Sequence, residues 1–195
     1  MKILGLYHND CAKPLFEYLQ NKGNEIVLTN EKLDISWCKQ QHFDLTISYT
    51  YRYILSKEII DALNGNVVNL HNSFLPFNRG ASPNIWSLIE ETPRGVTLHY
   101  MDTELDKGYI IAQKLITTGD GDTLSSSYNN LNQQAIELFC QAFQYYPYWQ
   151  EMKKKAQGKG SYHSVEDTKQ IEQLIDNYEM KIEELRQRYK EWKMR

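Results

Sequence analysis

The stretch that decides the fold is Val67-Val68-Asn69-Leu70-His71-Asn72-Ser73-Phe74-Leu75-Pro76-Phe77-Asn78-Arg79-Gly80. It begins with an apolar run that predicts a buried strand and continues into a loop rich in Pro, Asn and Gly. Asn69 and His71 stand two positions apart at the end of that strand, so their side chains point to the same face of the sheet. A carboxamide and an imidazole facing one way at a sheet edge suit acyl-group chemistry.

Strands and helices alternate on the amino-terminal side of this stretch. Apolar periodicity and the stop signals Gly23 and Gly65 predict strands at residues 2–7, 25–29, 44–49 and 66–70, with helices at 11–22, 36–41 and 56–65. Such alternation is typical of a mostly parallel sheet with helices on both faces. The predicted class is therefore α/β, a Rossmann-like, doubly wound sheet.

The carboxyl-terminal side begins with a helix whose first turn carries Pro83. The pattern predicts this helix at 83–91, strands at 95–101 and 109–116 with a glycine-bounded turn between them, and a long helix at 123–149. We expect residues 1–153 to form one catalytic domain, followed by a linker and an amphipathic helix at 154–195.

The tail carries a repeating apolar stripe after a linker at 157–161. Ser164 and Asp167 resemble a capping box at the start of a helix. The stripe has spacings of three and four and consists of Ile171, Leu174, Tyr178, Ile182, Leu185, Tyr189 and Trp192. Two interpretations stay open: a helix that packs on its own domain, and a helix that forms a homodimer.

Composition excludes several classes of protein. The 195 residues carry a formal net charge of −3, which gives no general basic field for nucleic acid. No apolar stretch approaches the length of a membrane span. The three cysteines are odd in number and lack CxxC spacing, so neither a zinc site nor a disulfide framework is expected. A cytoplasmic protein without a metal or a membrane partner is the simplest expectation.

Asp106 completes a candidate site, because the turn that carries it can return to the sheet edge where Asn69 and His71 lie. An imidazole can accept a proton from an attacking amine, a carboxamide can stabilise an oxyanion, and a carboxylate can orient the imidazole. The alternative is structural: Asn69 caps the strand, His71 bonds a backbone carbonyl and Asp106 is a turn residue. His99 is expected to be a structural partner.

Two segments carry a resemblance to a known family. The first is Asn69 to Gly80, followed by Pro83, Trp86, Thr92-Pro93 and Gly95-Val-Thr-Leu-His99; the second is Leu105-Asp106-Lys-Gly108-Tyr-Ile-Ile-Ala-Gln113. Residues 1–150 thereby resemble the 10-formyltetrahydrofolate-dependent formyltransferases, which implies the fold of that family. The resemblance places its Asn–His–Asp catalytic trio on Asn69, His71 and Asp106.

The resemblance also implies how the co-substrate N10-formyltetrahydrofolate binds. Two segments would line the pterin pocket, with cofactor contacts from Tyr51, Tyr53, Leu55, Asp102, Thr103, Glu104 and Leu105. Candidate acceptor contacts are Asn72, Asn78, Arg79 and Gly80, and a surface salt bridge is an equal alternative for Arg79. Many members of the family carry Pro where this chain has Asn72, which leaves the shape of the loop open.

The short tail resembles that of small sugar N-formyltransferases and of peptide-synthetase formylation domains. We therefore expect formyl transfer to the amine of a nucleotide-linked amino-deoxy sugar, in the biosynthesis of a surface polysaccharide. The alternatives are formylation of another primary amine, aminoacyl or ribonucleotide, and a non-catalytic module that binds folate or dimerises. The loop Tyr7-His8-Asn9-Asp10 offers no glycine nest for a phosphomonoester.

Overall fold

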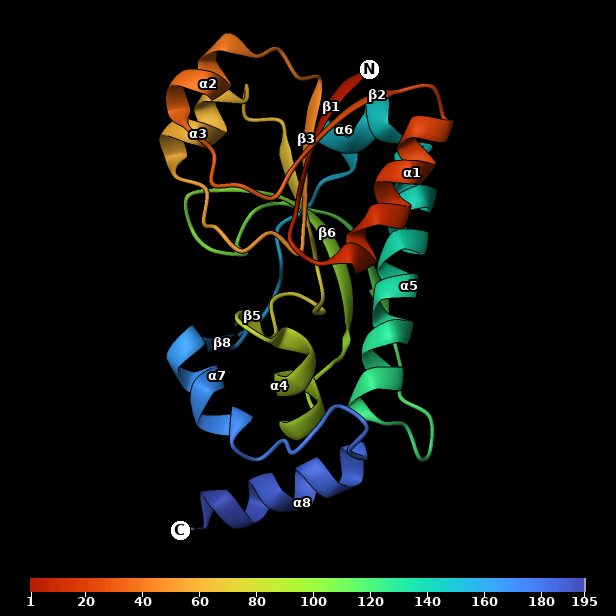
Figure 1. The fold of residues 1–195 in the computed structure, drawn as a ribbon, viewed down its shortest axis with the longest axis vertical. Helices are drawn as coiled ribbons and strands as arrows, with labels where there is room; N and C mark the ends of the chain where they lie inside the picture. The colour runs from red at the N-terminus through yellow and green to blue at the C-terminus, as the bar shows by residue number, and fades with distance from the viewer. Residues whose placement is uncertain (195) are drawn as a thin grey trace.

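The computed structural model describes residues 1–194 and is built around one six-stranded sheet (Figure 1). The strand order is β2-β1-β3-β4-β6-β7; the first four of these run parallel, while β6 and β7 are antiparallel to their neighbours. The strands are β1 (Lys2–Tyr7), β2 (Glu25–Thr29), β3 (Leu45–Tyr49), β4 (Val67–His71), β6 (Gly95–Tyr100) and β7 (Ile110–Leu115). The predicted α/β class and mostly parallel sheet are confirmed.

Helices cover both faces of the sheet (Figure 1). Ile3 packs in the core beneath α1 and α5, whereas its neighbour Leu4 packs in the core beneath α2 and α3. Alternate residues of one strand thus enter opposite cores, as expected for a sheet buried on both faces. These helices are α1 (Lys13–Asn21, preceded by a short turn η1 at Asp10–Ala12), α2 (Ile35–Gln40), α3 (Lys57–Ala62) and α5 (Leu124–Phe143).

The predicted helix at 123–149 is too long, because α5 ends at Phe143. Pro147 lies in the short 3-10 turn that follows, η2 (Tyr146–Tyr148), and the short helix α6 (Trp149–Met152) comes after this turn. A proline lacks the N–H that would continue the helical ladder. The turn buries Trp149, whose Nε1 donates to Ala142 O at 2.9 Å.

The tail forms two helices instead of the single predicted one. α7 (Val165–Glu172) and α8 (Ile182–Lys193) pack on α4 (Pro83–Ile89) at the lower end of the molecule in Figure 1. The capping box of Ser164 and Asp167 is present at the start of α7. Most of the apolar stripe is therefore buried within the chain, and the homodimer stays a prediction. The boundary between residues 153 and 154 also stays a prediction.

The predicted linker at 157–161 leads directly into a short strand, β8 (Tyr162–His163). It pairs in parallel with β5 (Arg79–Gly80), which lies in the loop after β4. This pairing joins the tail to the loop that was singled out in the sequence. Within residues 1–194, no helix is long and apolar enough to span a membrane.

Candidate active site

The candidate trio comes together at the edge where β4 ends. Asn69 and His71 lie on β4, and Asp106 arrives on the turn between β6 and β7. The backbone of Asp106 is left-handed, with φ of 53°, a conformation that costs a non-glycine residue energy and is often found at functional sites. At Gly108 an added Cβ would lie 1.7 Å from Tyr100 O, so the turn requires a glycine to pass this close to β6.

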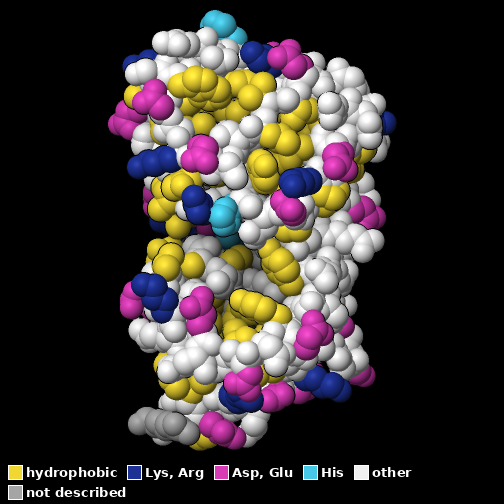
Figure 2. All heavy atoms as spheres, in the orientation of Figure 1, with side chains coloured by type: hydrophobic (Ala, Val, Ile, Leu, Met, Phe, Trp, Pro, Cys, Tyr) yellow, Lys and Arg dark blue, Asp and Glu magenta, His cyan; other side chains and the backbone are white. Residues whose placement is uncertain are grey.

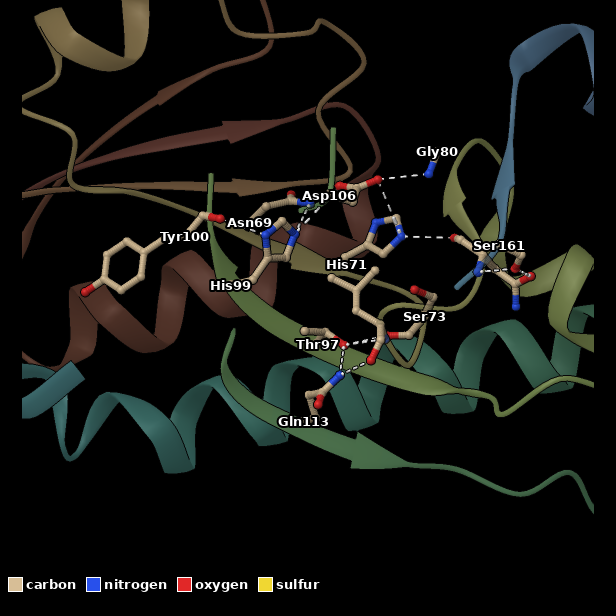
Figure 3. A network of polar contacts seen from close by, with 12 residues as sticks. Asn69, His71, Ser73, Gly80, Thr97, His99, Tyr100, Asp106, Gln113 and Ser161 are labelled. Carbon is tan, nitrogen blue, oxygen red and sulfur yellow. Dashed lines mark hydrogen bonds and ion pairs between the residues drawn. The ribbon is translucent and has the colours of Figure 1, made fainter. Parts of the chain in front are cut away.

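The carboxylate of Asp106 lies between two imidazoles (Figure 3). Its Oδ2 is 3.8 Å from His71 Nε2, and its Oδ1 is 3.7 Å from His99 Nε2. The backbone N–H of Gly80 donates to Oδ2 at 2.9 Å, which fixes the carboxylate. Since the side chains of Asp106, His71 and His99 are all at least nine-tenths buried, their charges interact more strongly than they would in water.

His99 belongs to the site more directly than the sequence predicted. Its Nδ1 donates to Tyr100 O at 2.8 Å, which leaves Nε2 as an acceptor 3.3 Å from Asn69 Nδ2. Burial lowers the pKa of His99 to about 4, because the charged form loses its hydration; nearby His71 lowers it further, and Asp106 opposes the shift. His99 is thus neutral at pH 7 and orients the carboxamide of Asn69.

The loop after β4 supplies backbone groups to the site. His71 Nε2 lies 3.3 Å from the carbonyl oxygen of Asn78, which can only accept. The hydroxyl of Ser161 holds this loop, because it accepts from Asn78 N at 2.8 Å and donates to Asn78 Oδ1 at 3.1 Å. Ser161, which directly precedes β8 of the tail, therefore holds the backbone that contacts His71.

A second network anchors the start of the same loop (Figure 3). Thr97 Oγ1, on β6, donates to Ser73 O at 2.7 Å and accepts from Leu75 N at 3.1 Å. Gln113 Nε2, on β7, donates to Leu75 O at 2.8 Å. Because the strands are fixed in the sheet, these bonds hold residues 73–75 beside His71.

Two cavities meet at Asn69, His71 and Gly80. The smaller has a volume of about 190 Å³ and lies against the turn that carries Asp106. The larger has a volume of about 630 Å³ and extends toward α4, α5 and the tail. A hollow crosses the middle of the face in Figure 2, and the charged side chains visible there lie around it. The arrangement suits two reactants that meet at the trio.

The structure brings most of the predicted co-substrate residues to the smaller cavity. It is lined by Tyr51, Tyr53, Leu55, Asp102, Thr103 and Leu105, whereas Glu104 is absent from its wall. Leu105 and the exposed Ile54 supply apolar surface at this wall, and the backbone there supplies polar groups. The wall therefore suits a flat heterocycle with polar edges.

The predicted acceptor residues divide into two groups. Asn72 and Gly80 line the larger cavity. Asn78 lines neither cavity, because it is fully buried and its Nδ2 donates to Thr92 Oγ1 at 2.7 Å. The structure thus places Asn78 inside the loop, where it is bonded to Ser161 and Thr92, and its contact with the acceptor stays a prediction. Arg79 also lines neither cavity, and its buried Nε has no hydrogen-bond partner within residues 1–194.

Sequence reasoning missed much of the larger cavity. Its unpredicted polar and aromatic wall includes Asn9, Asn84, Ser125, Tyr128 and Tyr178. These residues come from the β1–α1 loop, α4, α5 and the tail, which no single motif connects. One available signal was the placement of Asn9 after β1, since the loops at the carboxyl ends of parallel strands form binding sites.

Comparison with known proteins identifies proteins that are similar to this chain. A profile described as "Formyl transferase" matches residues 2–143. A crystal structure of the formyltransferase PseJ from Anoxybacillus kamchatkensis, in complex with UDP-4,6-dideoxy-4-formamido-L-AltNAc and tetrahydrofolate, is similar with a TM-score of 0.83 and 35% identity. That alignment covers 95% of this chain and 97% of the other.

Two curated proteins match a part of the chain. A methionyl-tRNA formyltransferase from Fusobacterium nucleatum is 36% identical over 102 residues, 52% of this chain. The bifunctional polymyxin resistance protein ArnA from Wigglesworthia glossinidia brevipalpis is 43% identical over 89 residues, 45% of this chain. The matched regions are 33% and 14% of these two relatives, which are therefore much longer than the region they share with this chain.

Proposed function

The chain belongs to the formyl transferase family, and from this premise we propose that it transfers the formyl group of N10-formyltetrahydrofolate to the amine of a nucleotide-linked amino-deoxy sugar. The observation that carries the proposal is the Asn69–His71–Asp106 cluster at the junction of two cavities. The smaller cavity takes the folate, and the larger takes the acceptor. The product seen in PseJ favours a UDP-linked 4-amino-4,6-dideoxyhexose as the acceptor.

The reaction is a direct transfer between the two substrates. The unprotonated sugar amine attacks the formyl carbon, so a new C–N bond forms and the formyl oxygen becomes an oxyanion. Asn69, whose amide is oriented by His99, donates a hydrogen bond to that oxygen, and so does protonated His71. As the bond to N10 breaks, the proton lost by the amine reaches N10, and Asp106 stabilises the charge on His71 meanwhile. The products are a formamide and tetrahydrofolate.

The composition of the walls supports an amino sugar more than a tRNA. Among residues 1–194, no Lys or Arg lines the larger cavity, and Arg52 is the one such residue on the wall of the smaller cavity. A tRNA acceptor would normally recruit a clustered basic face to its phosphates. The chain has a formal net charge of −3, which has the same sign as the phosphates of a tRNA and would not attract them.

The test is a transfer assay with N10-formyltetrahydrofolate and UDP-, dTDP- and GDP-linked amino sugars, read by mass spectrometry of the acceptor. We expect the gain of one formyl group in place of one hydrogen. His71→Ala and Asp106→Asn should each lower kcat by roughly 10²- to 10⁴-fold, the range for a positioned acid–base group. His42→Ala is the matched control, because His42 is exposed. Near-normal rates in both site variants would contradict the proposal.

A cytoplasmic location, a role in polysaccharide biosynthesis and a homodimer are further parts of this proposal. For the dimer, the tail that was expected to form it already buries Ile171, Leu185 and Tyr189 against α4. A dimer formed through the tail would therefore use surfaces of α7 and α8 other than the buried stripe. Light scattering of the protein with and without residues 165–195 measures whether the tail contributes.

A further inference from the structure

One member of the apolar stripe in the tail is not buried. Tyr178 is 66% exposed and lines the larger cavity, whereas every other member of the stripe is buried or half-buried. Tyr178 lies in the break between α7 and α8 and lines the same cavity as Asn69 and His71 of β4. A large aromatic ring left out of the core at the wall of a cavity is available for a ligand.

The position of Tyr178 is fixed by backbone hydrogen bonds to the start of α5. Its carbonyl oxygen accepts from Ser125 N at 2.7 Å, and that of Met180 accepts from Leu124 N at 3.0 Å. On the far side of the break, Ile182 N donates to Asp122 O at 3.1 Å. The break is therefore a built turn, and the backbone that carries the ring is fixed to the start of α5 before any ligand arrives.

A buried cation lies behind the adjoining wall. Arg94 is 7% exposed and belongs to none of the salt bridges within residues 1–194, although Asp122 is near enough for its charge to act on Arg94. Its Nε donates to Asn84 Oδ1 at 3.2 Å, and its Nη2 donates to Ser127 O at 2.7 Å. Burial lowers the pKa of Arg94 to about 10, so the group stays charged at neutral pH. The charge of Asp122 opposes this shift but offsets only a part of it, since burial is the larger effect, and an anion nearby would therefore be favourable.

Arg94 also sets the direction of Asn84. Because Asn84 Oδ1 accepts from Arg94, the amide Nδ2 is the free donor of this side chain, and Asn84 lines the cavity. The wall thus combines a neutral N–H donor with the field of a cation behind it. The N–H of Asn84 could donate to a phosphate while the charge of Arg94 attracts it from behind, so that no Lys or Arg has to contact the phosphate directly.

We propose that the end of the larger cavity formed by Tyr178, Asn84 and Ser125 is the nucleotide subsite. The ring of Tyr178 stacks on the base, and Asn84 Nδ2 donates to the diphosphate, with Arg94 behind it. The inference rests on the proposed function: the reacting amine must reach His71, so the nucleotide attached to the same sugar occupies the far end of this cavity. A volume of about 630 Å³ is in the range for a ligand of this size.

The test combines calorimetric binding of UDP, dTDP and GDP, and of their nucleosides, with formyl-transfer kinetics. Stacking on an aromatic ring is worth about 1–3 kcal/mol, so Tyr178→Ala should weaken binding of the preferred nucleoside diphosphate and its nucleoside by roughly 5- to 150-fold. The KM for the nucleotide sugar should rise in parallel, with kcat and the KM for N10-formyltetrahydrofolate unchanged. Tyr178→Phe should bind like wild type.

Two further variants separate stacking from a general effect. Asn84→Ala should weaken binding of the diphosphate but leave nucleoside binding unchanged. Tyr145→Ala is the control, because Tyr145 is 56% exposed and lines neither cavity. Unchanged nucleotide binding in Tyr178→Ala, with formyl transfer intact in wild type, overturns the subsite and leaves the proposed function standing. A wild-type protein that formylates no nucleotide sugar overturns both.

Discussion

Ser161→Ala tests whether the tail holds the catalytic loop. The substitution removes one hydroxyl, which accepts from Asn78 N and donates to Asn78 Oδ1. Asn78 is fully buried, so both of its groups lose a partner at once. The carbonyl of the same residue contacts His71, so a shift of Asn78 moves the backbone beside the catalytic imidazole.

The magnitude follows from the cost of leaving buried polar groups unpaired. Each such group costs about 1–3 kcal/mol, and Ser161 is only half-buried, which lets water replace a part of the loss. We therefore expect a decrease of about 2 kcal/mol in the free energy of unfolding. For a chain of this size that is roughly 4–8 °C in Tm. Misplacement of the loop should also lower kcat by about 10- to 100-fold.

Urea unfolding and formyl-transfer kinetics on the same preparations measure the two effects. Ser36→Ala is the matched control, since Ser36 is exposed on α2 and should change neither quantity. A stability loss with an unchanged kcat would refute the reasoning, because the tail would then support the fold without positioning the site. An unchanged free energy of unfolding would show that the two hydrogen bonds of the Ser161 hydroxyl make no net contribution to stability.

Two other changes probe the turn and the second imidazole. Burial lowers the pKa of His99 to about 4, from 6.5 in an unfolded chain, so the unfolded chain takes up the proton first as the pH falls. This contribution to stability should be full above about pH 6.5 and lost as the pH falls toward 4. In a plot of the urea midpoint against pH, His99→Gln should flatten the decrease over that range. His42→Gln should not, because His42 is exposed. At Gly108, an added Cβ would lie 1.7 Å from Tyr100 O, so Gly108→Ala should cost about 1–3 kcal/mol or more and depress formyl transfer. Gly119→Ala is its control, because the nearest atom to its Cβ would be a side-chain oxygen at 3.6 Å; equal activity of the two variants would contradict the role of the turn.

Local patterns were sufficient for the sheet and for the shared face of Asn69 and His71, whereas the catalytic role of these residues and of Asp106 was implied by the family resemblance and stays a proposal. The alternation before Asn69 determines the parallel strands, and the i, i+2 spacing of Asn69 and His71 places them on one face. The tail could not be predicted in the same way, since the stripe keeps its spacing across a break between two helices. Periodicity shows which residues can be buried on one face. It does not reveal a turn between two helices when the apolar spacing continues unchanged through that turn.

The larger cavity lay beyond sequence reasoning for a different reason. Its wall is assembled from side chains that are far apart in the chain, such as Asn9, Asn84 and Tyr178. Each of these is ordinary in its own segment, because Asn is common in loops and Tyr178 fits the stripe. They come together only in the fold, where the loop after β1, the end of β4 and the start of α5 line the same cavity.

Asn72 shows how this chain can hold the loop after β4 without the proline that the family resemblance leads us to expect at that place. Proline would fix the backbone dihedral φ after His71. Here Asn72 Nδ2 donates to Asn132 Oδ1 at 3.0 Å, and the same oxygen accepts from the hydroxyl of Tyr49 at 2.7 Å. Burial raises the pKa of Tyr49, so this hydroxyl stays a donor, and Asn132 is itself buried on α5. Hydrogen bonds from the side chain of Asn72 to a helix thus take the place of a ring constraint, and they leave Asn72 next to His71 on the wall of the larger cavity.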